Sequence, residues 1–336
     1  MLTCALCLWS TKRSNFYARG DLCYRIAPPF HIILEGDYYM KQIYIAPTYK
    51  CNNRCIMCGV FNTKKDSEWK YSLEELKTEI DSREIATGDV VIVSGGEPTI
   101  YPYFFDMLKY LELKDARVTI FSNGRAFKSN DNVSKLKECK YENMLIPLFG
   151  SNAQTHDRLT GAKGSFDDTI KGLHNLELNG LTHSIKTVVM KDNYANLPDW
   201  ACFVSENFKH PHMVSIHGLH LQGEAHNVSE ELYVRHDEIA NYVEKALDSL
   251  LSNEYKVGIS AFPLCTIDPY YWKYNIVSDI KNYKAISKDS KEISETNRNN
   301  YELMPTQCES CRVKELCQWP WRMYKKMFTL DYIKPI

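Results

Sequence analysis

Three cysteines between residues 51 and 58 have the spacing of a metal-binding loop. The run Cys51-x3-Cys55-x2-Cys58 has no histidine nearby, because none occurs between residues 32 and 155. A structural zinc site needs four protein ligands in a closed shell. A 4Fe–4S cluster takes one ligand per iron, so three cysteines leave one iron open to an exogenous chelate. The spacing therefore favours a reactive cluster, with zinc on a remote fourth ligand or plain reduced thiols as the alternatives.

A second group of cysteines lies in the last quarter of the chain. Its members are Cys265, in the segment Pro-Leu-Cys, and the run Cys308-x2-Cys311-x5-Cys317. Four thiolates satisfy a fully ligated 4Fe–4S cluster, and they satisfy a Cys4 zinc site equally well. The residues alone predict a second metal site and favour zinc at it, with an iron–sulfur cluster as the alternative.

The composition indicates the surroundings in which these thiols work. Lys and Arg total 41 against 42 for Asp and Glu, so no strongly basic field favours a nucleic-acid partner. No apolar run is long enough to cross a bilayer, and the charged N-terminus does not resemble a secretory signal. We therefore expect a cytoplasmic protein without a membrane partner, in which twelve cysteines serve as metal ligands more than as disulfides.

Strands and helices alternate along the first three quarters of the chain. The expected strands are 41–49, 89–93, 117–121, 143–149 and 185–190, and the expected helices are 72–85, 102–112, 165–180 and 229–252. Ser72 followed by Glu75 predicts a capping box at the start of the first of these helices. Strand, helix and strand in this order predict parallel βαβ units, hence an α/β barrel or an open sheet.

Three polar segments fall directly after expected strands. The cysteine loop follows the first strand, Gly95-Gly96-Glu97 the second, and Ser122-Asn123-Gly124 the third. The carboxyl ends of parallel strands meet at one edge of a sheet, where such folds place their functional loops. We therefore expect the three segments to share one face. A change of pattern near residue 250 predicts an N-terminal extension at 1–40, a core at 41–250 and a cysteine-bearing domain at 251–336.

The cysteine loop and the segments after it resemble a known family. CNNRCIMC (51–58) resembles the CxxxCxxC signature of the radical S-adenosylmethionine (SAM) superfamily, and SGGEP (94–98) resembles its GGE motif. SNAQTHDRLTGAKGSF (151–166) resembles its HDxxxGxxGSF stretch. The resemblance implies a partial (β/α)6 TIM-like barrel, and an enzyme that binds a 4Fe–4S cluster and SAM on the three cysteines.

The same resemblance implies the residues that contact SAM. The Gly-Gly-Glu segment holds the methionine amino group, Met57 packs near the adenine, and Lys186 faces the carboxylate. Relatives have a Ser-Leu-Asp run where this chain reads IPLFGS (146–151), so Ser151 takes that polar role. The implied SAM contacts are Met57, Gly95, Gly96, Glu97, Ser122, Asn123, Ser151 and Lys186.

The C-terminal cysteines resemble those of the twitch and SPASM extensions of radical SAM enzymes. These extensions fold around auxiliary 4Fe–4S clusters, so the resemblance favours an auxiliary cluster over structural zinc on Cys265, Cys308, Cys311 and Cys317. Cys4, Cys7 and Cys23 are interpreted as reduced thiols, with a labile third metal site as the alternative. Cys139 and Cys202 are interpreted as buried or incidental thiols, with hydrogen donation to a substrate radical as the alternative.

The activity that the resemblance implies is reductive cleavage of SAM to a 5′-deoxyadenosyl radical, which abstracts a substrate hydrogen. A flavodoxin or ferredoxin type of donor supplies the low-potential electron. An auxiliary cluster favours an oxidative outcome, such as a thioether or C–C crosslink in a ribosomally made peptide, and the chain resembles the maturases of His-Xaa-Ser repeat peptides. The alternatives are a radical SAM enzyme acting on a small molecule or nucleotide, and a zinc-binding scaffold without catalysis.

Overall fold

A curved, all-parallel sheet is the centre of the part of the chain that the structure describes. This computed structural model describes residues 41–336 except 59–67, 220–229, 277–282, 287–303 and 319–321, so the predicted extension 1–40 and Cys4, Cys7 and Cys23 lie outside it. The described residues all belong to one unit of contacts, Leu34–Ile336. Its strands are β1 (Gln42–Ile45), β2 (Val90–Val93), β3 (Arg117–Phe121), β4 (Asn143–Pro147), β5 (Ser184–Val189), β6 (Val214–Gly218), β7 (Val257–Ser260) and β8 (Tyr283–Ile286).

The strands follow one another across the sheet almost in chain order. The order is β7-β6-β5-β4-β3-β2-β1-β8, and every neighbouring pair is parallel. Each connection between parallel neighbours must return to the start of the next strand, and helices provide most of these returns. The α-helices in the described ranges are α2 (Leu73–Ser82), α3 (Phe104–Glu112), α4 (Asn130–Lys137), α5 (Ala153–Thr160), α6 (Ser165–Leu178), α7 (Leu197–Asn207), α8 (His236–Ser252) and α9 (Arg322–Met327).

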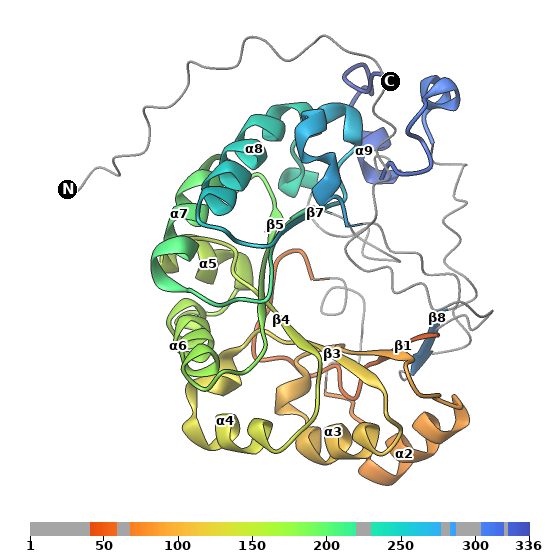
Figure 1. Cartoon of the computed structure of the whole chain (residues 1–336), viewed down its shortest axis with the longest axis vertical. Helices are drawn as coiled ribbons and strands as arrows, with labels where there is room; N and C mark the ends of the chain where they lie inside the picture. The colour runs from red at the N-terminus through yellow and green to blue at the C-terminus, as the bar shows by residue number, and fades with distance from the viewer. Residues whose placement is uncertain (1–40, 59–67, 220–229, 277–282, 287–303, 319–321) are drawn as a thin grey trace. The chain divides into compact units, whose positions relative to one another are not determined.

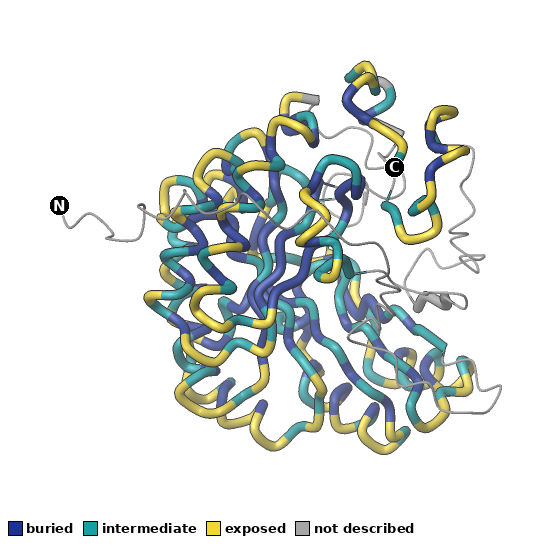
Figure 2. Tube along the Cα trace, turned by 45° about the horizontal axis from the view of Figure 1, so that its top comes forward, coloured by how far each residue is buried: buried dark blue, intermediate teal, exposed yellow. Residues whose placement is uncertain are grey.

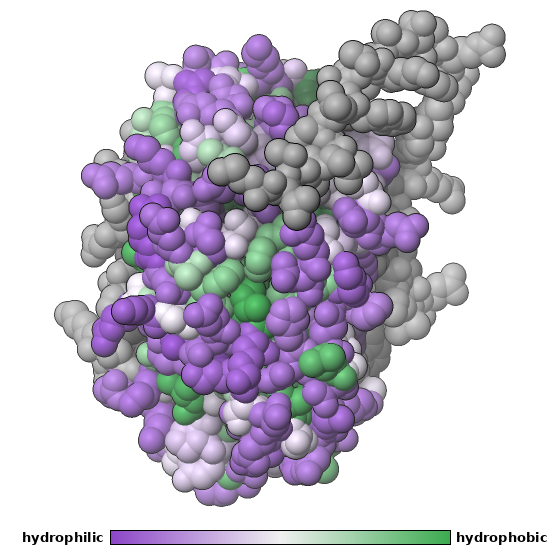
Figure 3. Space-filling model, turned by 90° about the vertical axis from the view of Figure 1, so that its left-hand side faces the viewer, coloured by the Kyte–Doolittle hydropathy of each residue, from purple (hydrophilic) through white to green (hydrophobic). Residues whose placement is uncertain are grey.

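The helices cover the outer, convex side of the sheet. Figure 1 shows α2, α3, α4, α6, α7 and α8 around the arc of strands, with the inner side of the arc facing away from them. The alternation of side chains explains this arrangement: in β2, Val91 and Val93 are fully buried, whereas Val90 and Ile92 between them are only half-buried. Figure 2 shows the buried strands behind helices whose outer turns are exposed. The surface on the side of α5, α6 and α7 is largely hydrophilic (Figure 3).

The predicted fold class is confirmed. β1 to β6 with the helices among them form the parallel α/β half-barrel that the resemblance implied. The predicted capping box is also present, with Ser72 accepting from the Glu75 N–H and the Glu75 carboxylate accepting from the Ser72 N–H. The first strand after the boundary expected near 250, β7, extends this sheet next to β6. A separate C-terminal domain at 251–336 stays a prediction. No helix in the described ranges is long and apolar enough to span a membrane.

Candidate active site

The three-cysteine loop leaves the carboxyl end of β1. Cys51, Cys55 and Cys58 are half-buried free thiols. The Asn53 N–H donates to Cys51 Sγ over 3.3 Å, and the Cys58 N–H donates to the carbonyl oxygen of Cys55 over 3.0 Å. Burial raises the pKa of Cys51 to about 12, and burial together with the two neighbouring thiols raises the pKa of Cys55 as well. Such thiols keep their protons until a cation displaces them, which is how a metal site loads.

The donor set fits an iron–sulfur cluster. Within the residues that the structure describes, no three His, Cys, Asp or Glu side chains surround one point in the way that a single ion requires. A tetrahedral zinc ion draws its sulfur ligands to about 2.3 Å. A cubane instead takes one thiolate at each iron, so its ligands stand further apart. Three thiols on one loop supply three of the four protein or ligand contacts that a cubane takes.

The Gly-Gly-Glu segment passes directly against the start of this loop. The Gly96 N–H donates to the Thr48 carbonyl over 2.9 Å, and the Glu97 N–H donates to the Lys50 carbonyl over 2.8 Å. A Cβ atom on Gly96 would lie 2.2 Å from that Lys50 oxygen, so the approach requires glycine. The sequence expectation that the segment after β2 lies beside the cysteine loop agrees with this geometry. Contact of Gly95 and Gly96 with SAM stays a prediction.

Glu97 joins the ends of β2 and β3. Its carboxylate is buried and accepts from the Thr99 N–H over 3.1 Å and the Thr99 hydroxyl over 2.6 Å. It also accepts from the Ser122 hydroxyl and from the Asn123 N–H, each over 2.7 Å. Oε1 accepts three of these bonds, and Oε2 accepts only the bond from the Asn123 N–H. Glu97, Ser122 and Asn123 therefore form one hydrogen-bonded unit next to the loop, and their predicted contacts with SAM remain predictions.

Lys186 is a half-buried cation on the inner face of the sheet. It lies between the buried residues Ile185 and Thr187 of β5, so its side chain points away from the helices. Its Nζ lies 5.0 Å from the ring centroid of Phe121, and no ion pair or hydrogen bond of this ammonium occurs in the described part of the chain. Burial lowers the pKa of Lys186 to about 8. A desolvated cation of this kind gains strongly from an anionic ligand.

The two other implied SAM contacts occupy neighbouring positions. Ser151 follows β4 and is half-buried, one residue before Asn152, which caps α5 by accepting from the Thr155 N–H over 2.9 Å. Met57 packs against an apolar cluster that includes Phe149 and Leu159. Both residues lie near the carboxyl ends of the strands, and their roles toward SAM stay predictions.

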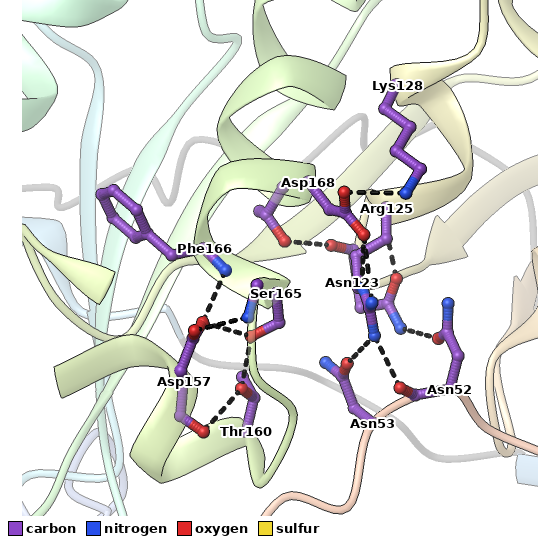
Figure 4. Close-up of polar contacts among 12 residues, drawn as sticks. Asn52, Asn53, Asn123, Arg125, Lys128, Asp157, Thr160, Ser165, Phe166 and Asp168 are labelled. Carbon is purple, nitrogen blue, oxygen red and sulfur yellow. Dashed lines mark hydrogen bonds and ion pairs between the residues drawn. The ribbon is translucent and has the colours of Figure 1, made fainter. Parts of the chain in front are cut away.

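The HDxxxGxxGSF stretch positions the cysteine loop. The Arg54 N–H donates to the Thr160 carbonyl over 2.8 Å, and the Ile56 N–H donates to the Leu159 carbonyl over 3.0 Å. The Asp157 carboxylate caps α6 by accepting from the N–H groups of Gly164 and Phe166 and from the Ser165 hydroxyl (Figure 4). The stretch thus fixes the end of α5, and the end of α5 fixes the loop.

Comparisons with known proteins agree with this geometry. The family model described as the Radical SAM superfamily matches residues 45–201, a range that includes the cysteine loop, the Gly-Gly-Glu segment and Lys186. Residues 45–201, a little under half of the chain, are thus similar to the radical SAM superfamily. The match supports an enzyme that uses a 4Fe–4S cluster and SAM.

Two curated relatives and one solved structure are similar to this chain. Fe-coproporphyrin III synthase of Methanosarcina barkeri (strain Fusaro / DSM 804) is 29% identical over 71% of this chain and 58% of that protein. Mycofactocin maturase MftC of Mycolicibacterium smegmatis (strain ATCC 700084 / mc(2)155) is 31% identical over 47% of this chain and 40% of that protein. Native anSMEcpe with bound AdoMet and Cp18Cys peptide shares the fold, with a TM-score of 0.56 and 14% identity over 88% of this chain and 93% of that chain. The chain spans about half the length of these curated relatives.

The second group of cysteines comes together beyond β7. Cys265, Cys308, Cys311 and Cys317 line one pocket. The Leu264 N–H donates to Cys317 Sγ over 3.4 Å. Burial raises the pKa of Cys317 to about 12 and that of Cys308 to about 11, and the neighbouring thiols add to both shifts. The four thiols that the sequence grouped therefore line one pocket of the fold, and a metal held by them stays a prediction.

Gln318 attaches this thiol segment to the sheet. Its side-chain oxygen accepts from the Ala261 N–H and from the Ser260 hydroxyl at the end of β7. Its amide nitrogen donates to the Ile276 carbonyl over 2.8 Å. Because Gln318 directly follows Cys317, these bonds fix the last cysteine of the group against the carboxyl end of the sheet.

Several residues of the site carry no signal that sequence analysis recognised. Asn52 and Asn53 lie inside the cysteine signature at positions where the motif allows any residue. Arg125 and Asp168 form an ion pair of 3.0 Å that contacts this loop. Their places in the chain are the available signal, because Arg125 directly follows Ser122-Asn123-Gly124 and Asp168 lies two residues after Phe166 of the HDxxxGxxGSF stretch.

His156 of the HDxxxGxxGSF stretch predicts a pH dependence of stability. Its buried Nδ1 accepts from the Phe149 N–H over 3.2 Å, and burial lowers its pKa to about 4. A base with a lowered folded pKa takes up its proton first in the unfolded chain. The contribution of His156 to the free energy of unfolding is therefore complete above its unfolded pKa of about 6.5, and it is lost as the pH falls from there toward 4.

We expect the free energy of unfolding of the iron-loaded enzyme to fall between pH 7 and pH 5. The share due to His156 is on the order of 2 kcal/mol, and His156→Asn, which keeps an acceptor for the Phe149 N–H, removes that share of the slope. Urea unfolding at the two pH values measures it. The exposed His210 provides the control, and an equal loss of slope in His210→Asn and His156→Asn would refute the assignment.

Proposed function

We propose that this chain is a radical SAM peptide maturase. The observation that carries the proposal is one edge of the sheet that holds the three-cysteine loop, the Gly-Gly-Glu segment and, on the adjoining inner face, Lys186. Cys51, Cys55 and Cys58 hold three irons and leave the fourth for SAM. When bound, the cluster and SAM supply a 5′-deoxyadenosyl radical that abstracts a substrate hydrogen.

The residues around this edge provide the groups that SAM binding needs. Lys186 has no ionic partner in the described ranges, so its ammonium suits the SAM carboxylate. Gly95, Gly96 and Glu97 hold the amino group with their backbone and the carboxylate, and Ser151, Ser122 and Asn123 complete the polar side of the site. Met57, which packs with Phe149 and Leu159, provides an apolar wall for the adenine.

The four C-terminal thiols hold an auxiliary 4Fe–4S cluster. Their pocket and the thiolate donor type support the proposal, since four cysteines match four irons. An auxiliary cluster accepts the electron that remains after a bond forms at a substrate radical. The outcome that fits this balance is a thioether or C–C crosslink.

A ribosomally made peptide is the proposed substrate. Mycofactocin maturase MftC, at 31% identity over the match, is a maturase by name, and this likeness supports a peptide here. The proposed electron donor is a protein of flavodoxin or ferredoxin type. The proposed location of both proteins is the cytoplasm.

A small-molecule substrate is the second candidate. The match to Fe-coproporphyrin III synthase covers 71% of this chain, a larger share than the match to the maturase. The greater extent of this alignment favours the second candidate. Its substrate would be a tetrapyrrole.

Anaerobic reconstitution followed by two substrate incubations tests the proposal. The reconstituted protein should hold about eight irons per chain and should convert SAM to 5′-deoxyadenosine in the presence of dithionite. If the protein contains zinc and only about four irons, the proposal of an auxiliary cluster is refuted. If iron-loaded protein makes no 5′-deoxyadenosine, the radical SAM assignment is refuted. Mass spectrometry after incubation with a peptide encoded beside this gene, or with an iron tetrapyrrole precursor assayed for conversion to iron coproporphyrin III, decides between the substrates. A peptide that loses two hydrogens supports the maturase, and a changed porphyrin supports the second candidate.

A further inference from the structure

Arg125 links the three-cysteine loop to helix α6. Its Nη1 donates to the carbonyl oxygen of Asn52 over 2.6 Å and to Oδ1 of Asn53 over 2.8 Å. Its Nε and Nη2 donate to Oδ2 of Asp168, over 3.2 and 3.0 Å. Asp168 lies in the first turn of α6. One guanidinium group therefore connects the backbone between the first two cysteines to a rigid helix (Figure 4).

The contacts around Arg125 close into a ring. The Arg125 N–H donates to Oδ1 of Asn123 over 3.1 Å, and Nδ2 of Asn123 donates to Oδ1 of Asn52 over 2.7 Å. The Thr169 hydroxyl holds the Asn123 carbonyl over 3.0 Å. Each member has two or more partners from different elements, so the ring fixes the guanidinium with little freedom to move.

The charges of this ring are partly shielded from water. The side chain of Arg125 is 15% exposed and that of Asp168 is 21% exposed, whereas Lys128, which also contacts Asp168 over 2.8 Å, is 51% exposed. Partly buried charges act over longer distances than exposed ones, because less solvent screens them. Arg125 is thus a fixed positive charge next to the loop, and Asp168 is a fixed negative charge behind it.

We propose that Arg125 is a positioning residue for the iron–sulfur cluster on Cys51, Cys55 and Cys58. It holds the Asn52–Asn53 segment in the shape that presents the thiols, and its charge favours the reduced cluster. The inference rests on the proposed function. Reduction adds one negative charge to the cluster, so a fixed cation nearby raises the reduction potential and a fixed anion lowers it. Asp168 therefore orients Arg125 and at the same time opposes its charge.

Redox titration of the reconstituted enzyme, followed by electron paramagnetic resonance, tests the proposal. In Arg125→Gln the equilibrium constant for cluster reduction falls roughly tenfold, a shift of about 59 mV to more negative potential for a one-electron couple. Asp168→Asn keeps a side-chain acceptor for Arg125 and removes the negative charge, so its potential shifts in the opposite direction. Arg125→Lys keeps the charge and loses the forked geometry. The reduction potential of Arg125→Lys should stay near that of the wild type, whereas a chelator should remove iron from this variant faster than from the wild type.

Arg117→Gln is the matched control. Arg117 also makes a bidentate ion pair, with Glu142, but it lies at the opposite end of β3. It should change neither the potential nor the iron content. Wild-type potential and wild-type iron retention in Arg125→Gln would overturn the proposal, as would shifts of the same sign in Arg125→Gln and Asp168→Asn. Wild-type protein that binds no redox-active cluster would instead refute the proposed function.

Discussion

Replacement of Cys51 by alanine is expected to abolish 5′-deoxyadenosine formation. Cys51 is one of three thiols that present a cluster on one loop, and a cubane with two protein ligands has no stable place in the site. Iron should fall from about eight to about four per chain, because the auxiliary group keeps its own ligands. Iron assay and chromatographic detection of 5′-deoxyadenosine after incubation with SAM and dithionite measure both effects.

Cys139→Ala is the control for loss of a thiol as such. Cys139 is half-buried, and its Sγ contacts the carbonyl oxygens of Lys135 and Phe105, which belong to the helical layer. This variant should keep its iron and its activity. If Cys51→Ala forms 5′-deoxyadenosine at the wild-type rate, the assignment of a SAM-cleaving cluster to the three-cysteine loop is wrong.

The sequence pattern predicted strands β1 to β5 and missed β6, β7 and β8. The strand expected at 117–121 has the same bounds in the structure, because Val118 and Ile120 are apolar and buried while their neighbours face the inner side. Helix α4 (Asn130–Lys137) was not predicted, since only Val133 and Leu136 of its eight residues are buried. Two apolar residues make too short a stripe to be recognised. The position of α4 follows from the need to connect β3 to a parallel β4.

The start of one long helix was placed too early. The pattern from 229 to 252 predicted one helix, whereas α8 begins at His236 after a short 3-10 turn at Glu230–Leu232. Leu232 and Val234 are buried and continue the apolar pattern, so the periodicity does not mark the boundary. Helix ends depend on local capping, which is a weaker signal than burial.

The motifs of the candidate site were predictable, and the contacts between them were not. Each motif is short and follows a strand, so its place at the edge of the sheet could be inferred from chain order. The bond from Arg125 to Asn52 joins residues 73 positions apart in the sequence. It exists because β2 lies between β1 and β3 and brings both loop ends to one place. The contact between these two distant parts of the sequence can be seen only once the order of the strands in the sheet is known.

Glu97 illustrates how the structure changes the interpretation of a motif. The sequence related Glu97 to SAM, and Ser122 and Asn123 to SAM separately. In the structure their hydrogen bonds connect the three residues. A substitution at any one of them therefore changes the positions of the other two, and loss of SAM binding in such a variant does not identify a direct contact.

Gly161→Ala is expected to disrupt the cysteine loop although it alters no proposed ligand. Gly161 has φ of 61° at the end of α5, where an alanine costs about 1 to 2 kcal/mol. A Cβ atom there would also lie 2.4 Å from the Arg54 carbonyl oxygen, inside the cysteine loop. That oxygen belongs to the backbone, so the collision moves the loop and not a flexible side chain. We expect lower stability in urea and loss of most of the iron held by Cys51, Cys55 and Cys58.

Gly164→Ala separates the two causes. Gly164 lies three residues further, with φ of 79°, and a Cβ atom there meets nothing within 4 Å. Its variant should show the same conformational cost of about 1 to 2 kcal/mol and keep both its iron and its 5′-deoxyadenosine formation. Equal iron content in the two variants would mean that the close approach of α5 does not position the loop. A difference confined to Gly161→Ala would show that the HDxxxGxxGSF stretch acts on the cluster through the backbone at Arg54, because strain at positive φ is common to both glycines.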